Sequence, residues 1–370
     1  MKIIQIYLLF LFIASGVSAQ TSSCWSGFRG NQSLTGVSSS QVPAQPSLLW
    51  TFQTGDIIKS APVMCNNRIV VGSTDGNVYC LDTNGKLLWK FETKNGFEAP
   101  ALILNEKVYI GNLDGTFFSI DLITGKKIWE YKTENQIIGA ANWWRVGSKT
   151  YLLVGSYDYY LHCVDAATGQ GVWKYESDNY INGAASCHGG QAIFGGCDGY
   201  LHVVDIAKGI AIRKIEVATY VSGSVAIEGT KAWVGDYDGK FSQVDLTRGN
   251  IVWQFEEPTR RLPFIASPAV YGSRVITGNH DKFIYCLDKN NGKLLWRFDT
   301  GSRVEASPVI TSGKALVANM RGDIFLLNLV TGKPDWSYEI GSAIINNPAV
   351  ADGKIVVGAS DGVIYCFGKK

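Results

Sequence analysis

The sequence predicts an all-β fold, an eight-bladed β-propeller of four-stranded antiparallel blades. Three observations predict it: a tryptophan recurs about every forty residues, an acidic turn recurs with the same period, and each copy contains four short strand-like runs. A four-stranded repeat of this length is typical of propeller blades. A chain of 370 residues would otherwise suggest two or three domains, but a ring grows by adding blades.

Two residue columns agree on the number of copies. The tryptophans are separated by 39, 40, 44, 80, 43 and 40 residues: Trp50, Trp89, Trp129, Trp173, Trp253, Trp296 and Trp336. Arg213, forty residues from both of its neighbours, fills the double interval. The acidic turns also number eight: Asp75, Asp114, Asp158, Asp198, Asp238, Asp281, Asp323 and Asp361.

Residues 99–131 illustrate one copy. Short β-branched or aromatic runs at 99–103, 107–111, 116–121 and 127–131 are bounded by turn residues such as Asp114-Gly115. A fourth strand at 49–52 has no strands before it, and three strands at 350–367 have no fourth after them. We expect the two ends to pair, which completes the eighth blade and closes the ring without an open edge.

The N-terminus reads as a secretory signal over residues 1–19. Lys2 precedes an apolar run at 3–13, and Val17-Ser18-Ala19 forms a small-x-small cleavage site. The run is too short to span a membrane, and no second candidate follows. We expect an exported protein, located in the periplasm, at the outer membrane or outside the cell, with a lead-in at 20–47 and one propeller domain at 48–367.

The sequence argues against a lipid anchor and against a nucleic-acid partner. A lipid anchor at Cys24 is disfavoured because Thr21 stands three residues before it, where lipoprotein signals carry an aliphatic residue. Nucleic acid is excluded as a partner because the formal net charge is only +2 and no basic cluster exceeds Arg260-Arg261.

The recurring polar residues have a structural explanation. Aspartates that precede the same turn in successive copies are expected to cap that turn through backbone amides. His162 and His202 share one column, which we interpret as a polar packing position rather than a zinc site. Cys187 and Cys197 straddle one hairpin and form the only local candidate for a disulfide.

Aromatic residues concentrate in the loops of the third to fifth blades. Six tyrosines and one tryptophan are expected to form a partner-binding sector there: Tyr157, Tyr159, Tyr180, Tyr200, Tyr220, Tyr237 and Trp144. Tyrosine brings large contact area at small entropic cost. The alternative is that several of them pack between blades. Arg260 and Arg261, in the longest connection, either meet an acidic partner or form a solvated loop tip.

The repeat resembles that of the quinoprotein-like family of pyrroloquinoline quinone (PQQ) enzymes. The motif is Leu-Asp-x-x-Thr/Asn-Gly-Lys-x-x-Trp, represented by residues 81–89, with Ala-Pro opening the blade and Val-Tyr-x-Gly-x-x-Asp-Gly in its middle. The resemblance implies that the seven tryptophans dock against the next blade and that the junction at Arg213 is weaker. Residues 25–30 also resemble the Trp-x-x-Phe-Arg-Gly lead-in of secreted members.

The family contains quinone dehydrogenases and non-catalytic scaffolds of the BamB outer-membrane assembly type. The dehydrogenases carry adjacent cysteines over the quinone and calcium ligands on insertions, and this sequence has neither a Cys-Cys pair nor a large insertion. We therefore expect no cofactor, no enzymatic activity and a protein partner in the cell envelope. The alternatives are a small PQQ- and calcium-dependent oxidoreductase and, more weakly, carbohydrate binding by the tyrosines.

Overall fold

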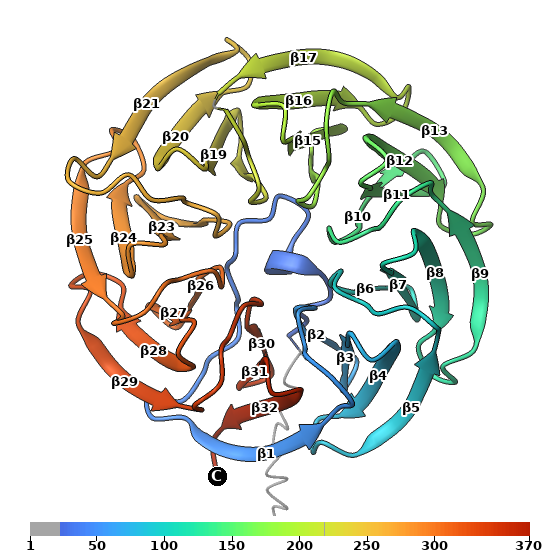
Figure 1. Ribbon diagram of the computed structural model, residues 1–370, viewed down its shortest axis with the longest axis horizontal. Helices are drawn as coiled ribbons and strands as arrows, with labels where there is room; N and C mark the ends of the chain where they lie inside the picture. The colour runs from blue at the N-terminus through green and yellow to red at the C-terminus, as the bar shows by residue number, and fades with distance from the viewer. Residues whose placement is uncertain (1–22, 218) are drawn as a thin grey trace, which may run out of the picture.

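The protein is an eight-bladed propeller. The structure, a computed structural model, describes residues 23–217 and 219–370. Eight four-stranded antiparallel sheets stand around a central axis (Figure 1). In each sheet the strands pair in a simple meander from the axis to the rim. The predicted fold class and blade number are confirmed.

Each blade uses strands of similar length at each position. The first strands are β2 (Val63–Cys65), β6 (Leu102–Leu104), β10 (Asn142–Val146), β14 (Ser186–His188), β18 (Ala226–Glu228), β22 (Ala269–Tyr271), β26 (Val309–Thr311) and β30 (Ala349–Ala351). The second strands are β3 (Arg68–Gly72), β7 (Lys107–Gly111), β11 (Lys149–Gly155), β15 (Gln191–Gly195), β19 (Lys231–Gly235), β23 (Arg274–Gly278), β27 (Lys314–Ala318) and β31 (Lys354–Gly358).

The outer half of each blade completes the ladder. The third strands are β4 (Asn77–Asp82), β8 (Thr116–Asp121), β12 (Tyr160–Asp165), β16 (Tyr200–Asp205), β20 (Lys240–Asp245), β24 (Phe283–Asp288), β28 (Asp323–Asn328) and β32 (Val363–Gly368). The fourth strands are β5 (Leu87–Glu92), β9 (Lys127–Lys132), β13 (Gly171–Glu176), β17 (Ile210–Glu216), β21 (Asn250–Glu256), β25 (Leu294–Asp299), β29 (Pro334–Glu339) and β1 (Ser47–Gln53). We number the blades 1 to 8 by their first strands, β2 to β30.

Burial explains the residue patterns of these strands. The middle strands are covered by a neighbouring blade on each face and are continuously apolar, as in β7, where four of five residues are buried. The fourth strands are exposed along the rim and alternate, as in β9. The first strand of blade 2 covers 102–104 rather than the predicted 99–103, because Ala99 instead accepts a hydrogen bond from Ser60 of blade 1.

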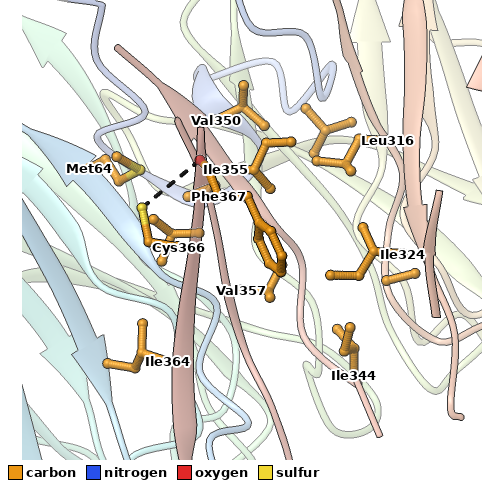
Figure 2. Close-up of a cluster of buried hydrophobic side chains, with 14 of the residues drawn as sticks. Met64, Leu316, Ile324, Ile344, Val350, Ile355, Val357, Ile364, Cys366 and Phe367 are labelled. Atoms are coloured by element: carbon orange, nitrogen blue, oxygen red, sulfur yellow. Dashed lines mark hydrogen bonds between the residues drawn. The ribbon is translucent and has the colours of Figure 1, made fainter. Parts of the chain in front are cut away.

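The ring closes through its two ends, as predicted. β1 pairs antiparallel with β32, with Ser47 opposite Gly368 and Gln53 opposite Val363. The core at this closure draws on both neighbouring blades. Figure 2 shows Phe367 of β32 lying among aliphatic side chains, including Leu316 from blade 7.

The column tryptophans bridge neighbouring blades. In six of the seven, the indole Nε1 donates to a backbone carbonyl of the next blade at 2.9–3.3 Å. The acceptor residue directly follows the Asp or Asn that precedes the outer turn of that blade. The pairs are Trp50–Thr83, Trp89–Leu122, Trp129–Ala166, Trp173–Ile206, Trp253–Lys289 and Trp296–Leu329. Trp336 instead packs against Phe367, with ring centroids 5.9 Å apart.

The outer turn must be glycine where the indole rests on it. Gly169 has φ +74°, and a Cβ there would approach the Trp129 ring to 2.6 Å. The positive φ and the ring contact therefore both require glycine in the Thr/Asn-Gly-Lys turn.

His162 and His202 occupy equivalent polar packing positions in successive blades, in agreement with the interpretation of the sequence. His202 Nε2 lies 2.8 Å from the Asp198 carboxylate, and its Nδ1 lies 3.1 Å from the Tyr175 hydroxyl of the preceding blade. His162 makes the same two contacts, with Asp158 and Tyr131. Tyrosines take this place in blades 1, 6 and 8, where each hydroxyl donates to the turn aspartate four residues earlier.

The lead-in crosses the axis and bonds to the inner strand of every blade. It contains the short 3₁₀ turn η1 (Phe28–Gly30), which lies at the centre of the ring in Figure 1. The bonded inner-strand residues, from blade 1 to blade 8, are Met64, Ile103, Asn142, Cys187, Ile227, Val270, Ile310 and Val350. The lead-in thus satisfies edge groups that would otherwise face the axis unpaired.

A disulfide fastens the start of the lead-in to blade 1. It joins Cys24 to Cys65, 41 residues apart, whereas Cys187 and Cys197 are buried and free. The only local candidate in the sequence, Cys187–Cys197, therefore forms no disulfide. Because its sulfur is in this bond, Cys24 has no free thiol for a lipid anchor. The predicted signal at 1–19 lies outside the described residues.

The disulfide predicts a stability difference. Cys65→Ser removes a cross-link closing a 41-residue loop and is expected to lower the free energy of unfolding by about 2–4 kcal/mol. Denaturant unfolding without reductant measures the difference. A Cys24→Ser, Cys65→Ser double variant serves as control, because it should lose no more than the single variant. Equal unfolding of wild type and Cys65→Ser would contradict the assignment.

Candidate functional site

The two faces of the ring are built from different segments. The front face carries the turns between second and third strands and the connections that lead from one blade to the next. The back face carries the other turns and the lead-in. On the front face each turn is tied to a connection: the Tyr157 amide donates to Gln136 at 3.0 Å, and the Tyr237 amide donates to Tyr220 at 3.1 Å.

Five of the predicted tyrosines gather on the front face of blades 3 to 5. We call Tyr157, Tyr159, Tyr180, Tyr220 and Tyr237 the front tyrosine cluster. Tyr157 and Tyr180 stack across the junction of blades 3 and 4, with centroids 4.6 Å apart, and Tyr159 lies 5.1 Å from Tyr180. Tyr159, Tyr180 and Tyr237 are 40%, 38% and 46% exposed, so the cluster is held by its neighbours while presenting ring area to solvent.

Asn182 connects the two halves of the cluster. Its Nδ2 donates to the Tyr220 hydroxyl at 2.9 Å and lies 3.1 Å from the Cys197 sulfur. Tyr220 in turn meets Tyr237 edge to face, with centroids 4.6 Å apart. Within the described residues the Asn182 Oδ1 is buried and accepts no hydrogen bond.

Tyr159 is held in a strained backbone conformation. Its φ is +76°, at the turn position that is glycine in six other blades and Lys282 in blade 6. A non-glycine residue in this region costs of order 1 kcal/mol. Tyr159 is therefore a departure from the glycine pattern of this turn that carries a cost in backbone energy.

Burial affects the ionisation of two tyrosines of the cluster and of the neighbouring Cys197. Burial raises the pKa of Tyr157 to about 12. Burial and then the contact with Cys197 raise the pKa of Tyr220 well above its ordinary value. Burial also raises the pKa of the Cys197 thiol. The Tyr157 and Tyr220 hydroxyls therefore stay protonated at neutral pH and can act as hydrogen-bond donors.

On the front face, around the axis and outside the tyrosine cluster, charged side chains lie in pairs. Lys59 and Glu98 form an ion pair of 2.7 Å. Across the axis Glu305 lies 3.0 Å from Arg303 and 3.7 Å from His280. Burial lowers the pKa of His280, which favours a neutral imidazole at pH 7.

Four predicted binding residues lie outside the cluster. Trp144 is half-buried at the back end of β10 and packs against the core between blades 3 and 4. Tyr200 lies nearer the rim, where Lys214 Nζ sits 4.1 Å above its ring. Arg260 and Arg261 are exposed on the neighbouring connection, and Arg261 pairs with Glu256. The structure therefore brings five tyrosines together, with the arginines beside them.

A quinone and calcium site would need a converging set of acidic ligands. Among residues 23–217 and 219–370, no group of three or more His, Cys, Asp or Glu side chains is placed to hold a metal ion. In addition, Phe28 and Leu34 of the lead-in pack around the axis against Ala140 and Ala184. The described residues do not fit that cofactor pair. In the same part of the chain no helix is long and apolar enough to cross a membrane.

Comparison with known proteins places this geometry in the class of quinoprotein-like propellers. The chain belongs to the family of outer membrane protein assembly factor BamB, whose model matches residues 40–142, 139–282 and 280–370. No curated protein matches at a significant level.

Solved structures share the fold at low identity. BamB from Moraxella catarrhalis is 16% identical, with a TM-score of 0.74 over 88% of this chain and 100% of that one. A europium-containing methanol dehydrogenase is 14% identical, with a TM-score of 0.76 over 94% and 98%. The quinohemoprotein alcohol dehydrogenase of Comamonas testosteroni is 13% identical, with a TM-score of 0.77 over 94% and 81%. Scaffold and enzyme thus share one architecture, and these likenesses establish the fold alone.

Two features of the cluster were not recognised in the sequence. The strain at Tyr159 has a signal there, because Tyr replaces Gly in an otherwise regular Asp-Gly turn. The hydrogen bond between Asn182 and Tyr220 has no signal in the sequence, because the two residues lie 38 positions apart in connections to different blades.

The strain at Tyr159 predicts that function and stability can be separated. Tyr159→Gly relieves the positive φ and is expected to leave the free energy of unfolding unchanged or raise it by up to about 1 kcal/mol. Thermal unfolding measures this. Gly199→Tyr, the reverse change in the next blade, is the matched control and should destabilise. A clear loss of stability in Tyr159→Gly would show that the ring mainly supports the fold.

Proposed function

We propose that this protein is an exported, non-catalytic scaffold that binds a protein partner in the cell envelope through the front tyrosine cluster. The observation that carries the proposal is the arrangement of exposed tyrosines from three neighbouring blades, fixed by stacking and by Asn182. The description of the matching family suggests outer-membrane protein assembly as the setting.

The chemistry of the cluster suits a polypeptide partner. Tyrosine is enriched among the residues that dominate binding energy, because it buries a large ring and keeps a polar tip. The stacked rings lose little conformational freedom on binding, which reduces the cost of association. Arg260, exposed beside blade 5, supplies positive charge for an acidic rim on the partner.

The disulfide supports export. Disulfides persist in oxidising compartments such as the periplasm. Cys24–Cys65 lies close behind the signal predicted at 1–19, so both features favour a location in the periplasm or at the outer membrane.

A PQQ- and calcium-dependent oxidoreductase is the second candidate, favoured by the shared architecture with the methanol dehydrogenase. Because the described residues do not fit that cofactor pair, we derive no catalytic step through it.

The partner hypothesis is tested by a Tyr180→Ser, Tyr237→Ser double variant. Two exposed aromatic contacts of about 1–2 kcal/mol each predict at least a tenfold loss of partner recovery from envelope extracts. Tyr271→Ser is the matched control, since Tyr271 is 53% exposed but lies on the back face. Undiminished recovery by the double variant, or no specific partner for wild type, would contradict the proposal.

Titration with PQQ and calcium tests the second candidate. We expect no change in melting temperature. Micromolar binding would raise the melting temperature by mass action and would overturn the non-catalytic assignment.

A further inference from the structure

One junction of the ring lacks the tryptophan that fills the others. In the groove between blades 4 and 5 the column residue is Arg213, on the outer strand β17. Its backbone position is that of the indole-bearing residues, since Arg213 pairs with Val203 as Trp173 pairs with Cys163 in blade 3.

The replacement leaves a cavity. The Arg213 groove encloses about 510 Å³ and is lined chiefly by His188, Gln191, Ile193, Val203, Arg213 and Leu246. This volume lies within the range of about 300–1,000 Å³ found for ligand pockets. Its floor is apolar, because Ile193, Val203 and Leu246 are each less than 10% exposed.

The groove between blades 2 and 3 shows what normally occupies this place. There the Trp129 indole packs on Tyr109, with centroids 5.7 Å apart, and donates to the Ala166 carbonyl at 3.3 Å. A smaller space of about 380 Å³ remains near that carbonyl, and Trp129 does not line it because the indole fills the outer part.

The hydrogen-bond acceptor for an indole is still present in the Arg213 groove. Leu246 follows Asp245 as Ala166 follows Asp165, so the Leu246 carbonyl corresponds to the acceptor used at six other junctions. Among the described residues no donor bonds to this carbonyl. The groove thus combines an apolar floor with an acceptor at the position where an indole N–H is received elsewhere.

The groove also offers a positive charge. The Arg213 side chain lies against Gly249, just as the indoles at other junctions lie against the turn glycine of the next blade. A Cβ at Gly249 would approach the Arg213 Nη1 to 2.7 Å. Arg213 is exposed and, within the described part of the chain, forms no ion pair or side-chain hydrogen bond. A carboxylate presented at the mouth of the groove would find an unpaired guanidinium.

We propose that the Arg213 groove binds a tryptophan side chain of a partner polypeptide, presented next to an acidic residue. The indole lies on Ile193, Val203 and Leu246, its N–H donates to the Leu246 carbonyl, and the neighbouring carboxylate pairs with Arg213. The site lies on the back half of the rim, away from the front tyrosine cluster, and does not depend on the function proposed for that cluster.

The test uses the full mature chain and two synthetic peptides, acetyl-Asp-Trp-Asp-amide and acetyl-Lys-Trp-Lys-amide. With 5-fluorotryptophan in the peptides, fluorine NMR reports binding without interference from the protein's own indoles. We expect saturable binding of the acidic peptide with a dissociation constant of about 0.1–1 mM. The basic peptide should bind at least tenfold more weakly, because Arg213 repels it.

Two variants separate the cavity from the charge. Arg213→Trp supplies the missing indole and should reduce binding of the acidic peptide more than tenfold while raising the melting temperature. Arg213→Gln keeps most of the cavity and should bind both peptides alike. The Tyr180→Ser, Tyr237→Ser variant is the control and should bind as wild type does.

Two results would overturn the proposal. One is no binding of the acidic peptide to wild type at about 5 mM. The other is unchanged binding to a folded Arg213→Trp protein. If Arg213→Trp does not fold, the Arg213→Gln variant decides the question. The proposal would then be overturned if Arg213→Gln preferred the acidic peptide over the basic peptide as strongly as wild type does.

Discussion

The ring depends on the contact between a fourth-strand indole and the glycine turn of the next blade. A four-stranded blade buries its two faces only against its neighbours, so the packing at each junction contributes directly to the stability of the ring. The indole supplies the largest apolar surface at the rim, and its N–H satisfies a turn carbonyl that would otherwise lose its partner on burial. Trp129 on Gly169 illustrates both effects, since a side chain at Gly169 would collide with the ring that donates to the Ala166 carbonyl.

The lead-in provides a second constraint from the inside. It reaches all eight inner strands and is fastened to blade 1 by Cys24–Cys65, so the back of the axis is occupied by the chain itself. The front face carries no such covering segment among the described residues. The front tyrosine cluster and the paired charges around the axis both lie on this uncovered face.

The two proposed binding sites both lie where the sequence departs from the repeat. Tyr159 replaces a turn glycine at a cost in backbone strain, and Arg213 replaces a docking indole and leaves a cavity. Sequences are expected to break local rules mainly at functional positions. The two departures lie on different faces and have different chemistry, one neutral and aromatic, the other cationic with an apolar floor. They therefore suit different ligands.

The sequence by itself determined the blade number and the closure of the ring, because these follow from a period of about forty residues and from local turn chemistry. The docking of the indoles was implied by the resemblance of the repeat to that of the PQQ enzymes. It also indicated which blades carry the tyrosines. Only the tertiary structure decided that Asn182 bonds to Tyr220, that Trp144 lies at the back and that Cys24 joins Cys65. Each of these depends on which residues of different repeats, or of the lead-in, meet in space. A repeat pattern specifies the strands within a blade, but contacts between blades and across the axis are set by the geometry of the closed ring.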